Sequence, residues 1–434
     1  MIPIPELAYL TPDLPGVGGK LKVRPDDFLV EEQPLYEPVG EGEHLYLFIE
    51  KTGVATPDVV RRLVKAFRVG RNDVGVAGMK DKHAITRQHF SVRTTDAGVP
   101  EADALAHLAE QSNVKVLWAD RHKNKLRRGH LAGNRFVIRV REVEPLRDTM
   151  TAKRVLDRLA AAGVPNYFGE QRFGYRQNNH LLGRLLLLGD YQAALNEMLG
   201  RPEPYESEAV QHGRAAYDRG DYAEALEHWP KHLRFDRQAL DALRQGRSAE
   251  QAVRAVDRTQ RHFLVTAMQS AVFNRVLHER ITGNTFDRLL PGDLAWKHDS
   301  RAVFSVDEAT AELENGPEGR VPKMAVSPSG PMWGPEMMRA EGEPGRIEQV
   351  ALAAMGLNEA QLAGSAMASA EGARRPLRIA LRDPDLSGGV DEHGAYLRLA
   401  FELPRGAFAT IVLREIMKQH APGEDAVGGN GESD

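Results

Sequence analysis

The chain has 434 residues, of which 42% are hydrophobic and 27% are charged, and its net charge is −4. These values are ordinary for a globular protein of about two or three domains, or of one domain with a large insertion. Cysteine is absent, which excludes disulfides, thiolate metal sites and cysteine nucleophiles. No apolar run approaches the ~18 residues of a membrane-spanning helix, and the N-terminus lacks the pattern of a signal peptide. We therefore expect a cytoplasmic protein with no membrane segment, in which any nucleic-acid site is a local basic patch.

The first third of the chain predicts alternating strands and helices. Residues 21–32 predict two short strands around a Pro-Asp-Asp turn, and residues 44–51 alternate as a strand. Thr56, followed by a proline, is expected to be the N-cap of a helix. Residues 85–93 and 114–118 predict further strands. Strands that pair antiparallel beside helices indicate an α+β fold.

One stretch in this region, GVAGMKDKHAITRQHFSV at residues 75–92, carries candidate catalytic chemistry. Asp81 lies between Lys80 and Lys82, whose positive charges favour the ionised carboxylate. Two glycines in the stretch are expected to allow backbone turns that are closed to other residues: Gly75 and Gly78. A charged aspartate on a tight basic loop suits a nucleophile or base that acts on an anionic substrate. The alternative is a surface turn whose charges are merely solvated.

A basic run follows at residues 121–141, RHKNKLRRGHLAGNRFVIRVR. It contains eight arginines and lysines and no acidic residue: Arg121, Lys123, Lys125, Arg127, Arg128, Arg135, Arg139 and Arg141. Its second half alternates as a strand that includes Phe136. This charge density favours a groove that contacts phosphates over a charged edge strand. Phe136 suits either the core or a base-stacking position.

The middle of the chain differs in character from its two ends. Residues 163–174 predict an ordered loop, residues 179–268 are almost wholly helical, and residues 289–335 contain short strands. Strands return at 375–382 and 395–403, joined by an acidic hairpin loop. We predict an α+β domain with a mixed, mostly antiparallel sheet at 1–160 and 370–434. A largely helical inserted domain at 161–369 interrupts it, and the polar tail at 421–434 is expected to be disordered.

Common catalytic motifs are missing. The chain has neither a phosphate-binding GxxxxGK loop nor a GxGxxG turn after a strand, its histidines lack zinc-ligand spacing, and its serines lack a nucleophile elbow. We expect no cofactor and no metal. A single carboxylate acting on a polyanion suggests chemistry at C1′ of a nucleoside or addition to a base. The alternative of a glycosidase, in which Asp26 or Asp27 supplies a second carboxylate, stays open.

Six separated segments together resemble the signature segments of the tRNA pseudouridine synthase D (TruD) family, in that family's order. They are LKVRPDDFLVEE, AGMKDKHAITRQHFSV, GNRFVIRVR, GVPNYFGEQRFG, AVFNRVLHERI and LPRGAFATIVLRE. The resemblance implies a pseudouridine-synthase-type sheet and cofactor-free conversion of a uridine in tRNA, at position 13 of the D-arm, to pseudouridine. It implies tRNA as the partner, and we expect a monomer. It assigns no function to residues 202–257.

The resemblance also implies roles for individual residues. Asp81 is the catalytic aspartate, acting as nucleophile at C1′ or as a base at the sugar. Phe28, Asn134 and Phe408 bind the base, Phe136 stacks near the target ring, and Lys22 pairs with Asp81. Candidate contacts to the RNA backbone are Lys80, Lys82, Arg127, Arg128, Arg172 and Arg176. Two alternatives stay open: a non-catalytic tRNA-binding protein acting as an RNA chaperone, and an RNA glycosidase that releases uracil.

Overall fold

The computed structural model describes residues 6–80, 82, 84–95, 97–363 and 370–418. The chain forms two compact units. One, which we call the sheet unit, combines Thr11–Val164 with Ile379–Ala421; the other, the helical unit, contains Pro165–Arg378.

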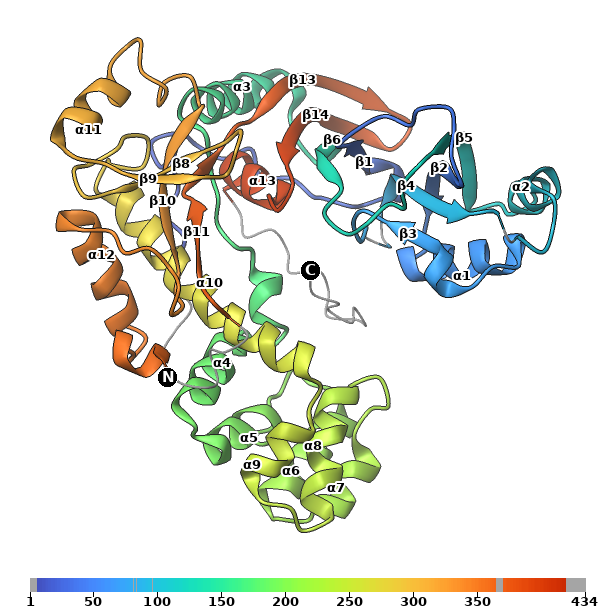
Figure 1. Cartoon of the computed structure of the whole chain (residues 1–434). Coiled ribbons are helices and arrows are strands. Elements are labelled where there is room, and N and C mark those ends of the chain that lie inside the picture. Colours follow the sequence, from blue (N-terminus) through green and yellow to red (C-terminus); the bar gives the residue numbers. More distant parts are fainter. Residues whose placement is uncertain (1–5, 81, 83, 96, 364–369, 419–434) are drawn as a thin grey trace. The chain divides into compact units, whose positions relative to one another are not determined.

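The sheet unit is built on an eight-stranded sheet in the order β13-β14-β6-β1-β4-β2-β5, with β3 paired to β4 (Figure 1). The strands are β1 Phe28–Pro34, β2 His44–Thr52, β3 Val74–Val76, β4 Ile85–Arg93, β5 Val114–His122, β6 Leu131–Arg141, β13 Arg382–Asp391 and β14 Gly394–Pro404. Among the described strands of this sheet, only β1 and β4 pair in parallel, and the other pairs are antiparallel. The predicted α+β fold with a mixed, mostly antiparallel sheet is therefore confirmed.

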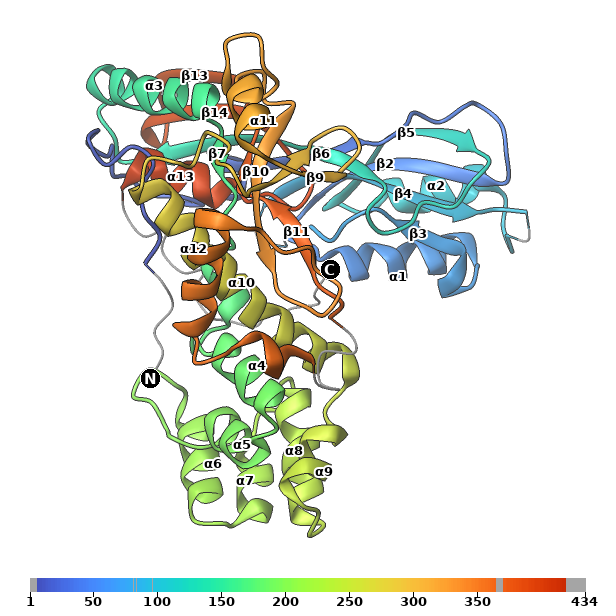
Figure 2. The same cartoon turned by 60° about the vertical axis from the view of Figure 1, so that its left-hand side comes forward.

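Helices cover parts of this sheet. They are α1 Thr56–Phe67, α2 Glu101–Ala109, α3 Pro145–Ala162 and α13 Ala409–Met417, with 3-10 turns η1 Pro25–Asp27 and η2 Arg71–Asp73. Helices α1 and α2 pack on β2, β4 and β5 (Figure 2). Leu47, Leu63 and Phe90 are fully buried there. Because α1 repeats its apolar residues at helical spacing, one of its faces supplies this core.

The helical unit is organised around the 25-residue helix α10, which packs against α4, α12 and β10 (Figure 1). Its helices are α4 Asn179–Leu188, α5 Tyr191–Leu199, α6 Glu208–Asp218, α7 Tyr222–His228, α8 Arg234–Arg244, α9 Ala249–Ala255, α10 Arg258–Thr282, α11 Glu308–Asn315 and α12 Gly342–Ala353, with 3-10 turns η3 Glu170–Phe173 and η4 Glu359–Ala363. Its four-stranded sheet has the order β11-β10-β8-β9, from β8 Leu294–Lys297, β9 Val303–Ser305, β10 Val326–Met332 and β11 Ala373–Pro376. The short strands β7 Val164–Pro165 and β12 Arg378–Ile379 pair with each other. No helix in the described part of the chain is long and apolar enough to cross a membrane.

Three strand predictions were wrong. Residues 375–382 form no single strand but are divided among β11, β12 and the start of β13. Residues 21–24 form no strand, and only an isolated bridge joins Lys20 to Arg141, because the chain turns into η1 at Pro25. The acidic segment expected to be a hairpin loop is instead most of β13. Among the described strands, β13 pairs with β14 alone, and most of its side chains are exposed. A strand so exposed shows no alternation of apolar residues, so the sequence gives no strand signal there.

Two local roles also differ from expectation. Ala55, not Thr56, is the N-cap of α1, and the Thr56 hydroxyl bonds to other parts of the unit. Neither Gly75 nor Gly78 has a positive φ. A Cβ on Gly75 would lie 2.2 Å from the carbonyl oxygen of Leu126. Glycine is therefore required at position 75 by close packing rather than by an unusual turn.

Candidate active site

Polar side chains from neighbouring strands share one face of the sheet. Glu32 of β1 lies opposite Asn134 of β6, and Val30 lies opposite Phe136. Directly opposed residues of an antiparallel pair point to the same face, and alternate residues of one strand do too. The first residue of β1, Phe28, therefore belongs to this face. The structure thus brings Phe28, Asn134 and Phe136 together on one side of β1 and β6.

Lys80, the residue directly before Asp81, is held by this polar face. Its Nζ atom donates to Oδ1 of Asn134 and lies 3.4 Å from Oε2 of Glu32. The side chains of Lys80 and Glu32 are 7% and 1% exposed. The other carboxylate oxygen of Glu32 accepts from the backbone N–H of His89 at 3.1 Å and lies 3.3 Å from the Nδ1 atom of the same residue. A buried carboxylate therefore compensates the lysine charge, and the lysine orients the asparagine.

The backbone of Lys80 is fixed as well. Its N–H donates to Oγ1 of Thr56 at 3.0 Å, and the Thr56 hydroxyl donates to Oε1 of Gln88 at 2.8 Å. The Lys80 carbonyl oxygen accepts from Nζ of Lys51 at 3.4 Å. Thr56, Gln88 and Lys51 are at most 1% exposed. The chain that leads into Asp81 is therefore anchored by main-chain and side-chain bonds, although Asp81 itself lies outside the described residues.

The predicted aromatic residues differ in exposure. Phe28 and Phe136 are each 7% exposed, and Phe408 is 39% exposed directly before α13. The ring of Phe136 packs 5.6 Å from that of Phe401. The Nζ atom of Lys22 lies 5.0 Å from the centre of the Phe28 ring. The predicted pairing of Lys22 with Asp81 stays a prediction, because Asp81 lies outside the described residues.

The predicted contacts to the RNA backbone fall into three groups. The Lys80 side chain is buried against Glu32 and Asn134 and is not on the surface. Lys82, Arg127 and Arg128 are exposed in the sheet unit. Arg172 belongs to the helical unit, where its guanidinium donates to Oγ1 of Thr266 at 2.7 Å and to Oγ of Ser270 at 3.3 Å.

The prediction for Arg176 was wrong. Its guanidinium donates to the carbonyl oxygens of Glu197, Gly200 and Arg201, and its side chain is only 8% exposed. These carbonyl oxygens take up the guanidinium N–H donors that a phosphate would need, so Arg176 stabilises the fold of the helical unit.

Not every cation of the basic run, residues 121–141, is available to bind phosphate. Arg141 is 3% exposed and donates to Oδ1 of Asp27 at 2.6 and 2.9 Å and to Oδ1 of Asp391 at 2.6 Å. The Arg141 guanidinium lowers the pKa of Asp391 to about 2. Asp27 is fully buried in this ion pair, whereas Asp26 is exposed. Asp27 is therefore a structural group and not a free second carboxylate for glycosidase chemistry.

Sequence reasoning missed the support for the Lys80 loop. Glu32 is one of two adjacent glutamates, and Lys51 and Gln88 lie in segments that read as ordinary strands. The one available signal was that Lys51 and Glu32 are charged at positions where alternation predicts an inward side chain. Among the described residues, no group of three or more His, Asp or Glu side chains could hold a metal ion.

The fold and this face define a class: an α+β protein whose mixed sheet supports an anchored, cation-bearing loop beside aromatic residues. The family model described as tRNA pseudouridine synthase D (TruD) matches residues 6–416, and the chain belongs to this family.

Individual relatives agree with that membership. The chain is 45% identical to the tRNA pseudouridine synthase D of Geobacter sulfurreducens, over 96% of this chain and 98% of that protein. It is 36% identical to a tRNA pseudouridine synthase D of Thermus thermophilus, over 95% and 92%. A crystal structure described as a tRNA pseudouridine synthase D from Methanosarcina mazei matches with a TM-score of 0.79 and 28% identity, over 95% and 96%.

Proposed function

We propose that this protein converts a uridine of tRNA to pseudouridine, with position 13 of the D-arm as the target. The observation that carries the proposal is the family match over residues 6–416, which includes all six sequence segments that resemble the family. The relatives named above cover nearly the whole chain. We place the activity in the cytoplasm, with tRNA as the partner, a monomeric protein, and no metal or cofactor.

In the proposed reaction the N1–C1′ bond of the uridine breaks, the uracil turns, and C5 forms a new bond to C1′. The proton on C5 is lost and N1 gains a proton, so substrate and product are isomers. Asp81 is the proposed catalytic residue, as nucleophile at C1′ or as base at the sugar. Phe28, Phe136 and Phe408 offer ring faces for the extruded base, and Asn134 offers an amide for its edge. Lys22 is proposed as the cation beside Asp81.

The anchored loop supports this assignment physically. A catalytic group must be held within a narrow range of positions, which requires supporting bonds to its neighbours. The main-chain bond of Lys80 to Thr56 and the buried contact of its side chain with Glu32 provide such support one residue before Asp81. A phosphate-contacting loop with no catalytic role would not need this buried network.

The proposal is tested with tRNA transcripts carrying tritium at C5 of uridine. Pseudouridine formation replaces the C5 hydrogen, so the purified protein is expected to release tritium to water while leaving no free uracil. Free uracil would instead identify a glycosidase. Binding of the tRNA without any release of tritium would identify a non-catalytic RNA chaperone.

A further inference from the structure

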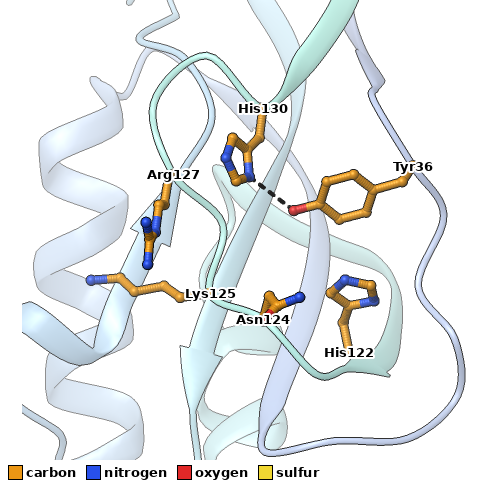
Figure 3. Close-up of a pocket in the computed structure, with 6 residues that line it drawn as sticks. All are labelled: Tyr36, His122, Asn124, Lys125, Arg127 and His130. Atoms are coloured by element: carbon orange, nitrogen blue, oxygen red, sulfur yellow. Dashed lines mark hydrogen bonds between the residues drawn. The ribbon is translucent and has the colours of Figure 1, made fainter.

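A cavity of about 510 Å³ opens in the sheet unit between the loop after β1 and the loop that joins β5 to β6 (Figure 3). It is lined by Tyr36, His122, Asn124, Lys125, Arg127 and His130. None of these residues belongs to the polar face around Lys80. The β5–β6 loop is nevertheless joined to the chain leading to Asp81, because the N–H of Gly129 donates to the carbonyl oxygen of Ala77 at 2.8 Å.

One wall of the cavity is aromatic and firmly held. The rings of Tyr36 and His122 stack at 4.9 Å with an interplanar angle of 21°. The Tyr46 hydroxyl donates to the backbone oxygen of Asn124 at 2.9 Å, so its oxygen is the acceptor for the Tyr36 hydroxyl at 3.3 Å. The Tyr36 hydroxyl is also hydrogen-bonded to Nδ1 of His130 at 2.9 Å. These bonds fix Tyr36, whose ring is covered by His122 on one face.

Positive charge lies on the other side of the cavity, where Figure 3 shows Lys125 and Arg127, with the Lys125 side chain extending away from Tyr36 and His122. Lys125 donates to the backbone oxygen of Asn72. The guanidinium of Arg127 is exposed and makes no hydrogen bond or ion pair with any other described residue. No carboxylate is among the described residues that line the cavity. The donors of this wall are therefore available to an anion.

Elsewhere in the basic run, arginines and lysines are already compensated. Each of five lies near a carboxylate of the same unit: Arg121 with Glu101, Lys123 with Glu41, Arg135 with Glu402, Arg139 with Asp391, and Arg141 with Asp27. The cavity is thus a place in the run where, among the described residues, positive charge is left without a neighbouring acid. His122 also lines the cavity; it is 9% exposed, and its Nδ1 atom has no hydrogen-bond partner in the described part of the chain.

The two walls together fit one kind of ligand. Cationic donors suit a phosphate, and the Tyr36–His122 stack offers an aromatic surface for a base. The volume exceeds what a phosphate alone requires. The lining loop is hydrogen-bonded, through Gly129 and Ala77, to the segment that leads to Asp81, and this connection favours a nucleotide of the same RNA as the ligand.

We propose that this cavity binds one unpaired nucleotide flanking the target uridine, with its phosphate at Lys125 and Arg127 and its base against Tyr36. This inference rests on the proposed function. It makes the cavity a determinant of which RNA sequence or loop shape is accepted, in addition to the groups that hold the uridine itself.

The test uses the full-length protein and D-arm RNAs in which 2-aminopurine replaces each nucleotide near the target, one at a time. One position is expected to change fluorescence on binding through stacking. Tyr36→Leu should abolish that change and weaken binding about tenfold, whereas Tyr36→Phe keeps the ring and should retain it. Urea unfolding of Tyr36→Leu beside the wild type separates loss of the ring from misfolding, and the retained signal of Tyr36→Phe shows that the hydroxyl is not what the base requires.

A charge-matched pair completes the test. Arg127→Gln should lower the slope of log Kd against log salt by about one, since one phosphate contact is lost. Lys115→Gln, which removes an exposed charge from β5 outside the cavity, should not. A fluorescence response that is the same in Tyr36→Leu and wild type, or equal salt slopes in the two charge variants, would overturn the cavity proposal. Tritium release by the wild type in that case would leave the synthase proposal intact, whereas its absence would count against the synthase.

Discussion

The buried contact between Glu32 and Lys80 gives the sharpest prediction. Glu32→Gln keeps the size of the side chain and an oxygen for the His89 N–H, but it removes the negative charge beside Lys80. Nζ of Lys80 lies 3.4 Å from Glu32, and both side chains are at least nine-tenths buried. Removing one partner of such a buried pair costs about 3–5 kcal/mol of unfolding free energy. We expect the lower end, about 3 kcal/mol, because the amide retains one hydrogen bond.

Glu31 provides the matched control on the same strand. It pairs with Arg87 at 2.9 Å, and these side chains are 32% and 35% exposed. A solvent-screened pair of this kind contributes about 0.2–1 kcal/mol, so Glu31→Gln should change little. Urea unfolding measures the stability of both variants, and tritium release from tRNA measures turnover. Glu32→Gln is expected to lose at least about tenfold in turnover because the Lys80 side chain, next to Asp81, loses its ion pair with Glu32.

A double variant tests whether the charge of Lys80 accounts for the lost stability and the position of its side chain for the lost turnover. Adding Lys80→Met to Glu32→Gln removes the lysine charge as well and should recover part of the lost stability. Turnover should stay low, since the bond from Lys80 to Asn134 is also gone. Equal stability and equal turnover in the two single glutamate variants would refute the view that Lys80 is anchored by Glu32.

Three further results are expected. Thr56→Val leaves the Lys80 N–H without its acceptor and should cost about 1–3 kcal/mol of unfolding free energy in urea, with reduced turnover, whereas Thr56→Ser should restore both. Arg141 lowers the pKa of Asp391 from 3.8 to about 2, so this contact stabilises the fold above pH about 4 and is lost as the pH falls towards 2. The stability difference between wild type and Asp391→Asn should therefore be constant near neutral pH, shrink as the pH falls below about 4 and vanish only below about pH 2; a difference independent of pH would contradict this. Phe408→Ala should cost at most about 1.5 kcal/mol of unfolding free energy, less than the ~3–5 kcal/mol lost when a buried phenylalanine is truncated. It should nevertheless slow the conversion of tRNA in single-turnover assays. Unchanged kinetics would contradict a role for Phe408 in binding the base.

The sequence predicted the sheet where its strands are buried on one face. The alternation through Phe136 in β6 is such a case, and its apolar residues are buried as expected. β13 was not predicted because it is an edge strand. Most of its side chains are exposed to solvent, so its sequence does not alternate between apolar and polar residues.

The candidate site was predictable only in part. The charged loop around Asp81 is evident because its residues are contiguous. The roles of Glu32 and Thr56 depend on contacts across 24 to 48 residues of chain, which no local pattern encodes. The ion pairs of the basic run could not be predicted for the same reason. Its acidic partners come from distant strands, as Asp391 does for Arg141.

The measurement that tests the central claim most directly maps pseudouridine in tRNA by carbodiimide labelling and primer extension, for wild type and Asp81→Asn, with tRNA affinity measured in parallel. The account predicts a new stop at position 13 with wild-type protein, and no stop with an Asp81→Asn variant that folds and binds tRNA as tightly. A stop that persists in Asp81→Asn, or no stop with a wild-type protein that binds tRNA, would contradict it.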